Sequence, residues 1–171
     1  MSLSGEKGSM LIRPVMLLLF LTVTFSSQQT LEAQPSSTSC DGSLWKYVFK
    51  PQRLKKLHPS CITVTGTVGK STEEKYGDLQ VQLKLDPKAE LVKLLNNRNR
   101  KAQNGNLVLV FVCANKGTQP KAPAACEKFT RKVQIPDEGT RVLVTGDYVE
   151  DVEPKHGWTE IHPVTSILPI L

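Results

Sequence analysis

The residues best suited to chemistry lie near the C-terminus, in the motif HGWTEIHP that begins at His156. If this motif is an extended strand, Trp158, Glu160 and His162 project from one face, because side chains alternate along a strand. Imidazole and carboxylate groups together suit zinc or a similar divalent ion. The candidate metal ligands are therefore His156, Glu160 and His162. Asp147, on the preceding predicted strand, would be the fourth.

The same residues also have a purely structural interpretation. Ligands two positions apart on a strand lack the specificity of a motif such as HExxH. In the structural interpretation Trp158 closes one end of a barrel, Glu160 pairs with a lysine or arginine, and His162 bonds to the backbone. The chain contains no GxSxG motif, phosphate loop or Cys/His nucleophile pair. The sequence therefore favours a role without catalysis and without a cofactor; a metal-dependent hydrolase that uses this hairpin is the alternative.

The charge of the chain points to a binding role. Its formal net charge is +6, and a basic domain favours anionic partners such as nucleic acid or acidic glycans. An evenly charged surface, or an interaction with another exported protein, is the competing interpretation. The candidate ligand-binding residues are aromatic, basic or ionisable and lie on predicted strands and turns: Tyr76, Lys84, Tyr148, His156, Trp158, Glu160 and His162.

Alternation of apolar and polar residues predicts the strands that must position these groups. Predicted strands cover residues 61–70, 76–86 and 106–113 and both halves of a hairpin at 141–167, with a turn at Pro154 and Gly157. A helix is expected at 87–101, where Pro87 begins a pattern of leucines at helical spacing. The remaining expectations are a short basic helical turn at 54–57, a loop and one short helix at 114–132, and a small strand at 133–136.

This order of elements is that of a five-stranded Greek-key barrel, the OB-fold, with one or two short helices. Gly66 and Gly146 fit the strong coiling that small barrels require. An open sandwich and a lipocalin-like barrel are the alternatives. Trp45, Tyr47 and Phe49 alternate at the start of the domain, and we interpret them as packing over the open end of the core in preference to a base-stacking stripe.

The first 26 residues have the layout of a secretory signal peptide. Lys7 and Arg13 precede a short apolar run, and small residues follow at Ser26, with a second acceptable cleavage site after Ala33. Residues 27–43 are rich in Ser, Thr and Pro and predict a flexible lead-in, and residues 44–168 form the single expected domain. The protein is thus expected to be secreted or periplasmic.

The four cysteines form an even set in a chain with an export signal, which favours two disulfides. Three connectivities are available to four cysteines. We favour Cys40 with Cys61 and Cys113 with Cys126, because each pair ties a loop segment to the end of a strand nearby in sequence. None of the four has a CxxC neighbour, so a zinc site is the weaker interpretation.

Several stretches also carry a resemblance: PQRLKKLHPSCITVTGTV, GDLQVQLKLD, NLVLVFVCANKGTQPKAPAAC and TGDYVEDVEPKHGWTEIHPVTSI. Together they resemble a group of small exported bacterial proteins of unknown function with an OB-fold-like architecture. The similarity spans residues 45–167, and HGWTEIHP is its most specific motif. That group carries a histidine in a GD-x-H pattern where this chain has Gln80. The resemblance implies a fold and a compartment but no activity.

Overall fold

The computed structural model describes residues 39–119, 124–131 and 133–171, all of which fall within one compact unit. The predicted signal peptide and most of the lead-in lie outside the described residues. Within the described part the chain is mostly β, with a five-stranded mixed sheet, three short α-helices and two short 3-10 helices. None of the helices in this part is long and apolar enough to span a membrane.

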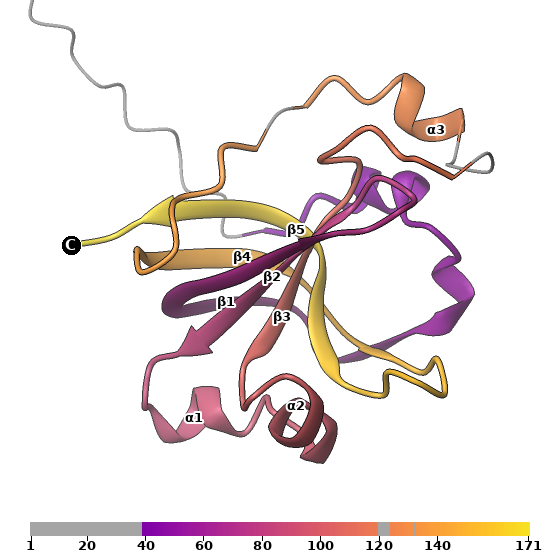
Figure 1. Ribbon diagram of the computed structural model, residues 1–171. Coiled ribbons are helices and arrows are strands. Elements are labelled where there is room, and N and C mark those ends of the chain that lie inside the picture. The colour runs from indigo at the N-terminus through magenta and orange to yellow at the C-terminus, as the bar shows by residue number, and fades with distance from the viewer. Residues whose placement is uncertain (1–38, 120–123, 132) are drawn as a thin grey trace, which may run out of the picture. The chain divides into compact units, whose positions relative to one another are not determined.

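The five strands form one sheet that closes into a barrel (Figure 1). They are β1 Leu54–Glu73, β2 Leu79–Leu85, β3 Leu107–Phe111, β4 Arg141–Asp151 and β5 Thr159–Pro169. Their order around the barrel is β1-β2-β3-β5-β4, and β1 also pairs with β4. The β3–β5 pair is parallel and the other pairs are antiparallel. The final hairpin is therefore confirmed.

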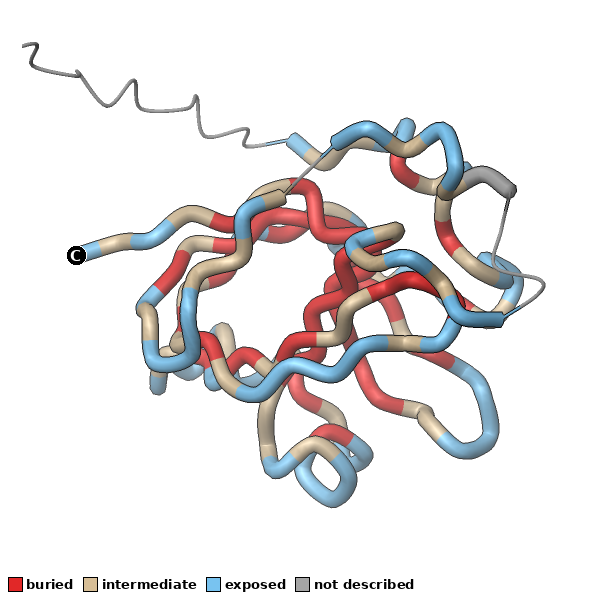
Figure 2. Tube along the Cα trace, turned by 45° about the horizontal axis from the view of Figure 1, so that its top comes forward, coloured by how far each residue is buried: buried red, intermediate tan, exposed pale blue. Residues whose placement is uncertain are grey.

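The alternation of β2 and β4 directs one side chain in two into the barrel. Val81, Leu83 and Val144 are fully buried there, with β3 residues Leu107 and Leu109. Figure 2 shows the buried residues concentrated along the strands and the exposed residues along the connections. All five residues of β3 are buried, as an apolar strand covered on both faces requires.

The first strand is longer than its pattern predicted. It begins at Leu54, where a helical turn was expected, because the eleven-residue β4 supplies backbone partners as far as Asp151, which pairs with Leu54. Two 3-10 helices precede it, η1 Gly42–Tyr47 and η2 Pro51–Arg53. The predicted helical turn at 54–57 was therefore wrong.

The expected helix at 87–101 is two helices, α1 Ala89–Val92 and α2 Asn97–Ala102. Asn96 separates them because its side chain accepts hydrogen bonds from the backbone of Arg98 and Asn99 at 2.8 and 3.0 Å, which starts a new helix. The third helix, α3 Ala124–Glu127, lies in the connection from β3 to β4. Residues 133–136 are not a strand, contrary to prediction.

Both predicted disulfides are present. Cys40 is bonded to Cys61 and Cys113 to Cys126. The first fastens the start of the domain to β1, and the second fastens the end of β3 to α3. Such crosslinks stabilise a small domain chiefly by restricting its unfolded chain.

Candidate functional site

The outer face of β4 is the platform on which the site is built. Asp147, Val149 and Asp151 share that face, and all three are buried at 5, 0 and 0% exposure. Val149 packs in an apolar cluster with Leu44 and Val48 of the N-terminal segment. The two carboxyl groups flank this cluster, so the outer face of β4 has an apolar centre between two buried carboxyl groups.

The two carboxylates fasten the N-terminal segment at three points. Asp147 accepts a hydrogen bond from Trp45 Nε1 at 3.0 Å and forms an ion pair with Lys56 Nζ at 3.5 Å. Asp151 faces Arg53 Nε at 3.5 Å. Residues 45–56 are thus held along the outside of the barrel. Trp45 and Tyr47 pack over this second cluster and not over the open end of the main core, which corrects that part of our prediction.

The fastened segment carries alternating aromatic rings and cations, which we name the basic aromatic strip. Lys56 Nζ lies 4.2 Å from the centre of the Trp45 ring, Lys46 Nζ 4.9 Å from Tyr47 and Lys50 Nζ 5.3 Å from Phe49. At these distances a cation is attracted to a ring face. The strip consists of Trp45, Lys46, Tyr47, Phe49, Lys50 and Lys56; its three lysines are exposed and its three rings half-buried.

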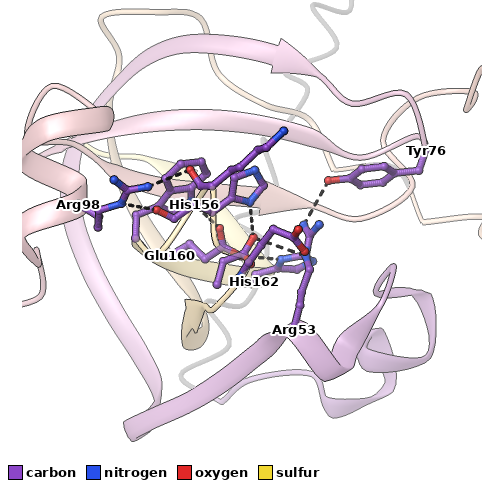
Figure 3. Close-up of polar contacts among 10 residues, drawn as sticks. Arg53, Tyr76, Arg98, His156, Glu160 and His162 are labelled. Atoms are coloured by element: carbon purple, nitrogen blue, oxygen red, sulfur yellow. Dashed lines mark hydrogen bonds and ion pairs between the residues drawn. The ribbon is translucent and has the colours of Figure 1, made fainter.

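A chain of polar contacts, which we name the hairpin network, starts at Arg53 (Figure 3). It runs through Arg53, Asp151, His156, Trp158, Glu160 and His162. His156 Nδ1 lies 2.7 Å from Asp151, and the His156 ring stacks on Trp158 at 4.3 Å. Trp158 Nε1 donates to Glu160 at 3.0 Å, and the other Glu160 oxygen meets His162 Nδ1 at 2.9 Å.

Tyr76, in the turn between β1 and β2, joins the strip to the hairpin network. Its hydroxyl accepts a hydrogen bond from Arg53 at 3.3 Å, and its ring stacks on Phe49 with centres 4.6 Å apart. Burial raises the pKa of the Tyr76 hydroxyl, against the opposing effect of Arg53. The phenol therefore stays neutral at physiological pH. Through its contacts with Phe49 and Arg53, Tyr76 connects the β1–β2 turn to the strip and, by way of the Arg53–Asp151 pair, to β4.

Helix α2 holds the β4–β5 turn that carries His156. Arg98 donates to the carbonyl oxygens of His156 and Lys155 at 2.7 and 3.1 Å (Figure 3). Asn99 is fully buried. Its Nδ2 donates to the Thr159 carbonyl, and its Oδ1 accepts hydrogen bonds from the Thr159 backbone N–H and hydroxyl. Helix α2 therefore holds the turn at residues 155, 156 and 159.

Three atoms of this region are buried with no hydrogen-bond partner among the described residues: Arg53 Nε, Asp78 Oδ2 and His162 Nε2. Asp78 is 1% exposed, and its other oxygen accepts from Cys113 N at 2.9 Å. Burial raises the pKa of Asp78 to about 6, although His162 and Arg53 act to lower it. Burial thus outweighs the opposing effects of His162, the Cys113 backbone and Arg53 on the pKa of Asp78.

The structure brings together only part of the predicted metal site. Trp158, Glu160 and His162 do share a face, but His156 pairs with Asp151, and Asp147 binds the strip. Among the described residues no three His, Cys, Asp or Glu side chains are grouped so that they could hold a metal ion. A zinc site made from these residues is therefore not supported by their geometry.

The structural interpretation needs correction as well. Trp158 packs on Val108 and Val110, on the outer face of β3, and so does not close the barrel's end. Glu160 pairs with Trp158 and His162 in place of a lysine or arginine, and His162 bonds to that carboxylate in place of the backbone. Trp158 lies just before β5, and Glu160 and His162 lie on β5; Glu160 bonds to both of the others because all three side chains share one covered face.

Two further candidates lie away from the hairpin network. Lys84 is exposed on β2, opposite Thr67 of β1, at the end of the strand far from the Tyr76 turn. Tyr148 is buried in the barrel, where its hydroxyl donates to the Leu94 carbonyl at 2.7 Å. Of the seven candidates, Tyr76, His156, Trp158, Glu160 and His162 therefore belong to one region.

Sequence reasoning missed several members of this region. Arg53 belongs to a basic cluster that resembles a solvated face, and Trp45 meets Asp147 across 102 positions of sequence. Asn99 lies in a polar helix end with no apolar periodicity. The sequence signal was the alternation of Trp45, Tyr47 and Phe49, which predicted packing, but over the open end of the core and not over β4.

We expect Trp158→Phe to lower the free energy of unfolding by about 1 to 2 kcal/mol, because it keeps a smaller aromatic ring but leaves a buried Glu160 oxygen without its donor. Urea unfolding at neutral pH measures this change. The matched control is Trp45→Phe, where Lys56 still pairs with Asp147, so the loss is smaller. Equal losses in the two variants would contradict the importance assigned to the Trp158–Glu160 bond.

A scan against models of known protein families finds no match to this chain, and no curated protein is significantly similar to it in sequence.

Proposed function

We propose that this protein is an exported, non-catalytic binding module of OB-fold type that binds an acidic polysaccharide along the basic aromatic strip. The strand order β1-β2-β3-β5-β4 with a parallel β3–β5 pair supports the OB-like Greek-key assignment. Barrels of that type bind oligosaccharides or oligonucleotides at one face and its loops. Two disulfides and the signal-peptide layout support a secreted or periplasmic location.

The observation that carries the proposal is the row of three cation–aromatic pairs on residues 45–56. Ammonium groups on a fixed segment recognise a chain of negative groups with less loss of conformational freedom, and the contacts of Trp45 with Asp147 and of Arg53 with Asp151 hold this segment in place. The strip is exposed on the outside of the barrel, so a polymer can lie along it.

The arrangement of the rings favours an acidic glycan over single-stranded nucleic acid. Nucleic acid that binds without sequence preference stacks its bases on open aromatic faces. Here Lys56, Lys46 and Lys50 each cover a ring face. What the strip presents to a ligand is therefore charge, which matches sulfate or carboxylate groups on a sugar chain.

A charge-matched pair of variants tests the proposal. Changing Lys46, Lys50 and Lys56 together to Gln should weaken binding of a labelled heparin oligosaccharide by at least about tenfold at low salt. Changing Lys88, Lys93 and Lys101 to Gln removes the same charge near α1 and α2, and should alter binding less than about twofold. Fluorescence anisotropy measures both.

Equal losses in the two triple variants would show that only net charge matters and would contradict the strip. Tighter binding of single-stranded oligothymidine than of heparin would replace the glycan with nucleic acid. A neutral dextran oligosaccharide, which lacks negative groups, is expected not to bind. The hydrolase alternative would require a bound metal, which elemental analysis of the purified protein detects.

A further inference from the structure

The disulfide between Cys40 and Cys61 closes a loop that contains the whole basic aromatic strip. Its two cysteines are 21 positions apart, and every ring and every lysine of the strip lies between them. We name residues 40–61 the strip loop. The other disulfide, between Cys113 and Cys126, closes a separate loop that contains no residue of the strip. One bond therefore constrains the proposed binding surface directly, and the other serves as a matched comparison.

The C-terminal end of the strip loop is not held by a regular strand ladder. Lys56 and Cys61 both pair with β4, but the pairing is irregular between them, at residues 57–60. Where the ladder resumes, Cys61 lies opposite Asp147. That carboxylate binds Trp45 and Lys56. The disulfide is therefore attached beside the group that orients the strip.

Noncovalent contacts near the N-terminal end of the strip loop lie at the surface. The Asp41 backbone N–H donates to Thr165 Oγ1 at 2.9 Å. The Asp41 carboxylate pairs with Arg131 at 3.0 Å, and both side chains are 39% exposed. Ion pairs that are this exposed contribute little to stability. The bond at Cys40 is therefore the strongest restraint at this end of the loop.

The main core of the barrel is built almost entirely without the strip loop. The buried residues of the loop are Leu44, Val48 and Leu54, and all three belong to the separate cluster over β4. The loop contributes only the partly buried Leu57 to the main core. The barrel can therefore stay folded while the strip loop loosens.

The bond between Cys40 and Cys61 is within reach of a small dithiol. Both cysteines are half-buried, and the neighbouring residues 42, 43, 59 and 60 are exposed. A thiolate of the dithiol attacks one cysteine sulfur, which breaks the Sγ–Sγ bond and forms a mixed disulfide. The second thiolate then releases that cysteine and closes the dithiol's own disulfide. The dithiol is oxidised by two electrons, and its two thiol protons end on Cys40 and Cys61.

We propose that the Cys40–Cys61 bond is a redox switch for the basic aromatic strip. In the oxidised protein the closed loop holds the strip ready for an acidic polysaccharide. Reduction by a dithiol loosens the strip loop and weakens binding, because the freed chain must lose conformational entropy when the ligand orders it. The barrel stays folded in both states. This inference rests on the proposed function, since it concerns regulation of the same surface.

The experiment uses the Cys113→Ser/Cys126→Ser protein, in which dithiothreitol can act on only one bond. Reduction should weaken binding of a labelled heparin oligosaccharide by at least about fivefold in fluorescence anisotropy, and reoxidation should restore the affinity. The matched Cys40→Ser/Cys61→Ser protein should bind as weakly as the reduced one, and its affinity should not respond to dithiothreitol. Far-UV circular dichroism verifies that the barrel is folded in each state.

Acrylamide quenching of Trp45 without ligand tests the switch independently of heparin. Reduction should increase this quenching, because Trp45 lies in the strip loop and is half-buried. Failure of the oxidised protein to bind heparin would contradict the proposed function, whereas unchanged quenching would overturn the switch whether or not heparin binds. Equal heparin affinity in the two redox states would overturn the switch and leave the function intact. Unfolding of the barrel on reduction would overturn it too, since the bond would then support the whole domain.

Discussion

Gly146→Ala is expected to lower the free energy of unfolding by about 3 kcal/mol or more, enough to prevent a small domain from accumulating in folded form. A Cβ at this position would lie 2.4 Å from Ile161 Cγ2 and 2.5 Å from the Pro163 carbonyl oxygen. The second of these is backbone and cannot rotate away. Thermal and urea unfolding, followed by circular dichroism, measure the loss.

The reason for the close approach lies in the register of the final hairpin. Gly146 pairs with Ile62 on one side and Val164 on the other, and the β4–β5 pairing is irregular on both sides of it. The matched control is Gly69→Ala in β1, where the nearest atom, Gln82 O, is at 3.2 Å. Its cost should be below about 1 kcal/mol. A Gly146→Ala protein as stable as this control would contradict the packing described.

Asp78→Asn is expected to stabilise the protein at neutral pH and to have little effect in acid. Burial raises the pKa of Asp78 from 3.8 to about 6. Between these values the folded state keeps a proton that the unfolded state has released, so stability falls as pH rises through this window. The full loss by pH 7 is about 3 kcal/mol, and asparagine does not incur it.

The measurement is the difference in free energy of unfolding between Asp78→Asn and wild type. This difference should grow by about 2 kcal/mol between pH 4 and pH 7. His162 and Arg53, which favour the charged carboxylate, and Glu74, which opposes it, are present in both proteins. A difference that does not change with pH would contradict the cost assigned to the buried carboxylate.

Asp86→Asn provides a control of opposite sign. Hydrogen bonds from Arg141 and Thr65 lower the pKa of Asp86, so its carboxylate stabilises the fold above its unfolded pKa, and this contribution is lost as pH falls through the folded pKa. The variant should therefore be less stable than wild type at neutral pH and approach it in acid. Relative to wild type, the free energy of unfolding thus rises with pH for Asp78→Asn and falls with pH for Asp86→Asn.

The elements that the sequence predicted well are those whose own pattern determines them. The alternation in β2 and in the final hairpin sets both the strand and the buried face, and the two disulfides followed from cysteines close to strand ends. Gly146 was expected to permit strong coiling, and the Cβ distances show why no larger residue fits. Local information was sufficient for these features.

The elements that it predicted poorly depend on distant partners. Residues 54–57 place two lysines between two leucines, without the alternation of a strand, and the ladder to β4 makes them one. The helix at 87–101 is interrupted because Asn96 bonds to the backbone ahead of it and to the Gly157 carbonyl. Neither contact has a signature in the periodicity of hydrophobic residues.

The candidate site illustrates both cases. The shared face of Trp158, Glu160 and His162 follows from strand parity alone, so the sequence predicted it. What those residues bond to depends on how the N-terminal segment folds over β4, and Arg53 reaches Asp151 from almost one hundred positions away. The hairpin therefore supports the strip instead of forming an independent metal centre.

The central claim is that the basic aromatic strip contacts the ligand, and the two tryptophans allow a direct measurement on the wild-type protein. Trp45 belongs to the strip and is partly exposed, whereas Trp158 packs on Val108 and Val110 and is 7% exposed. Acrylamide should quench one class of fluorescence, that of Trp45. Saturation with a heparin oligosaccharide is expected to protect that class. Undiminished quenching of Trp45 at saturation would place the ligand elsewhere and contradict the claim.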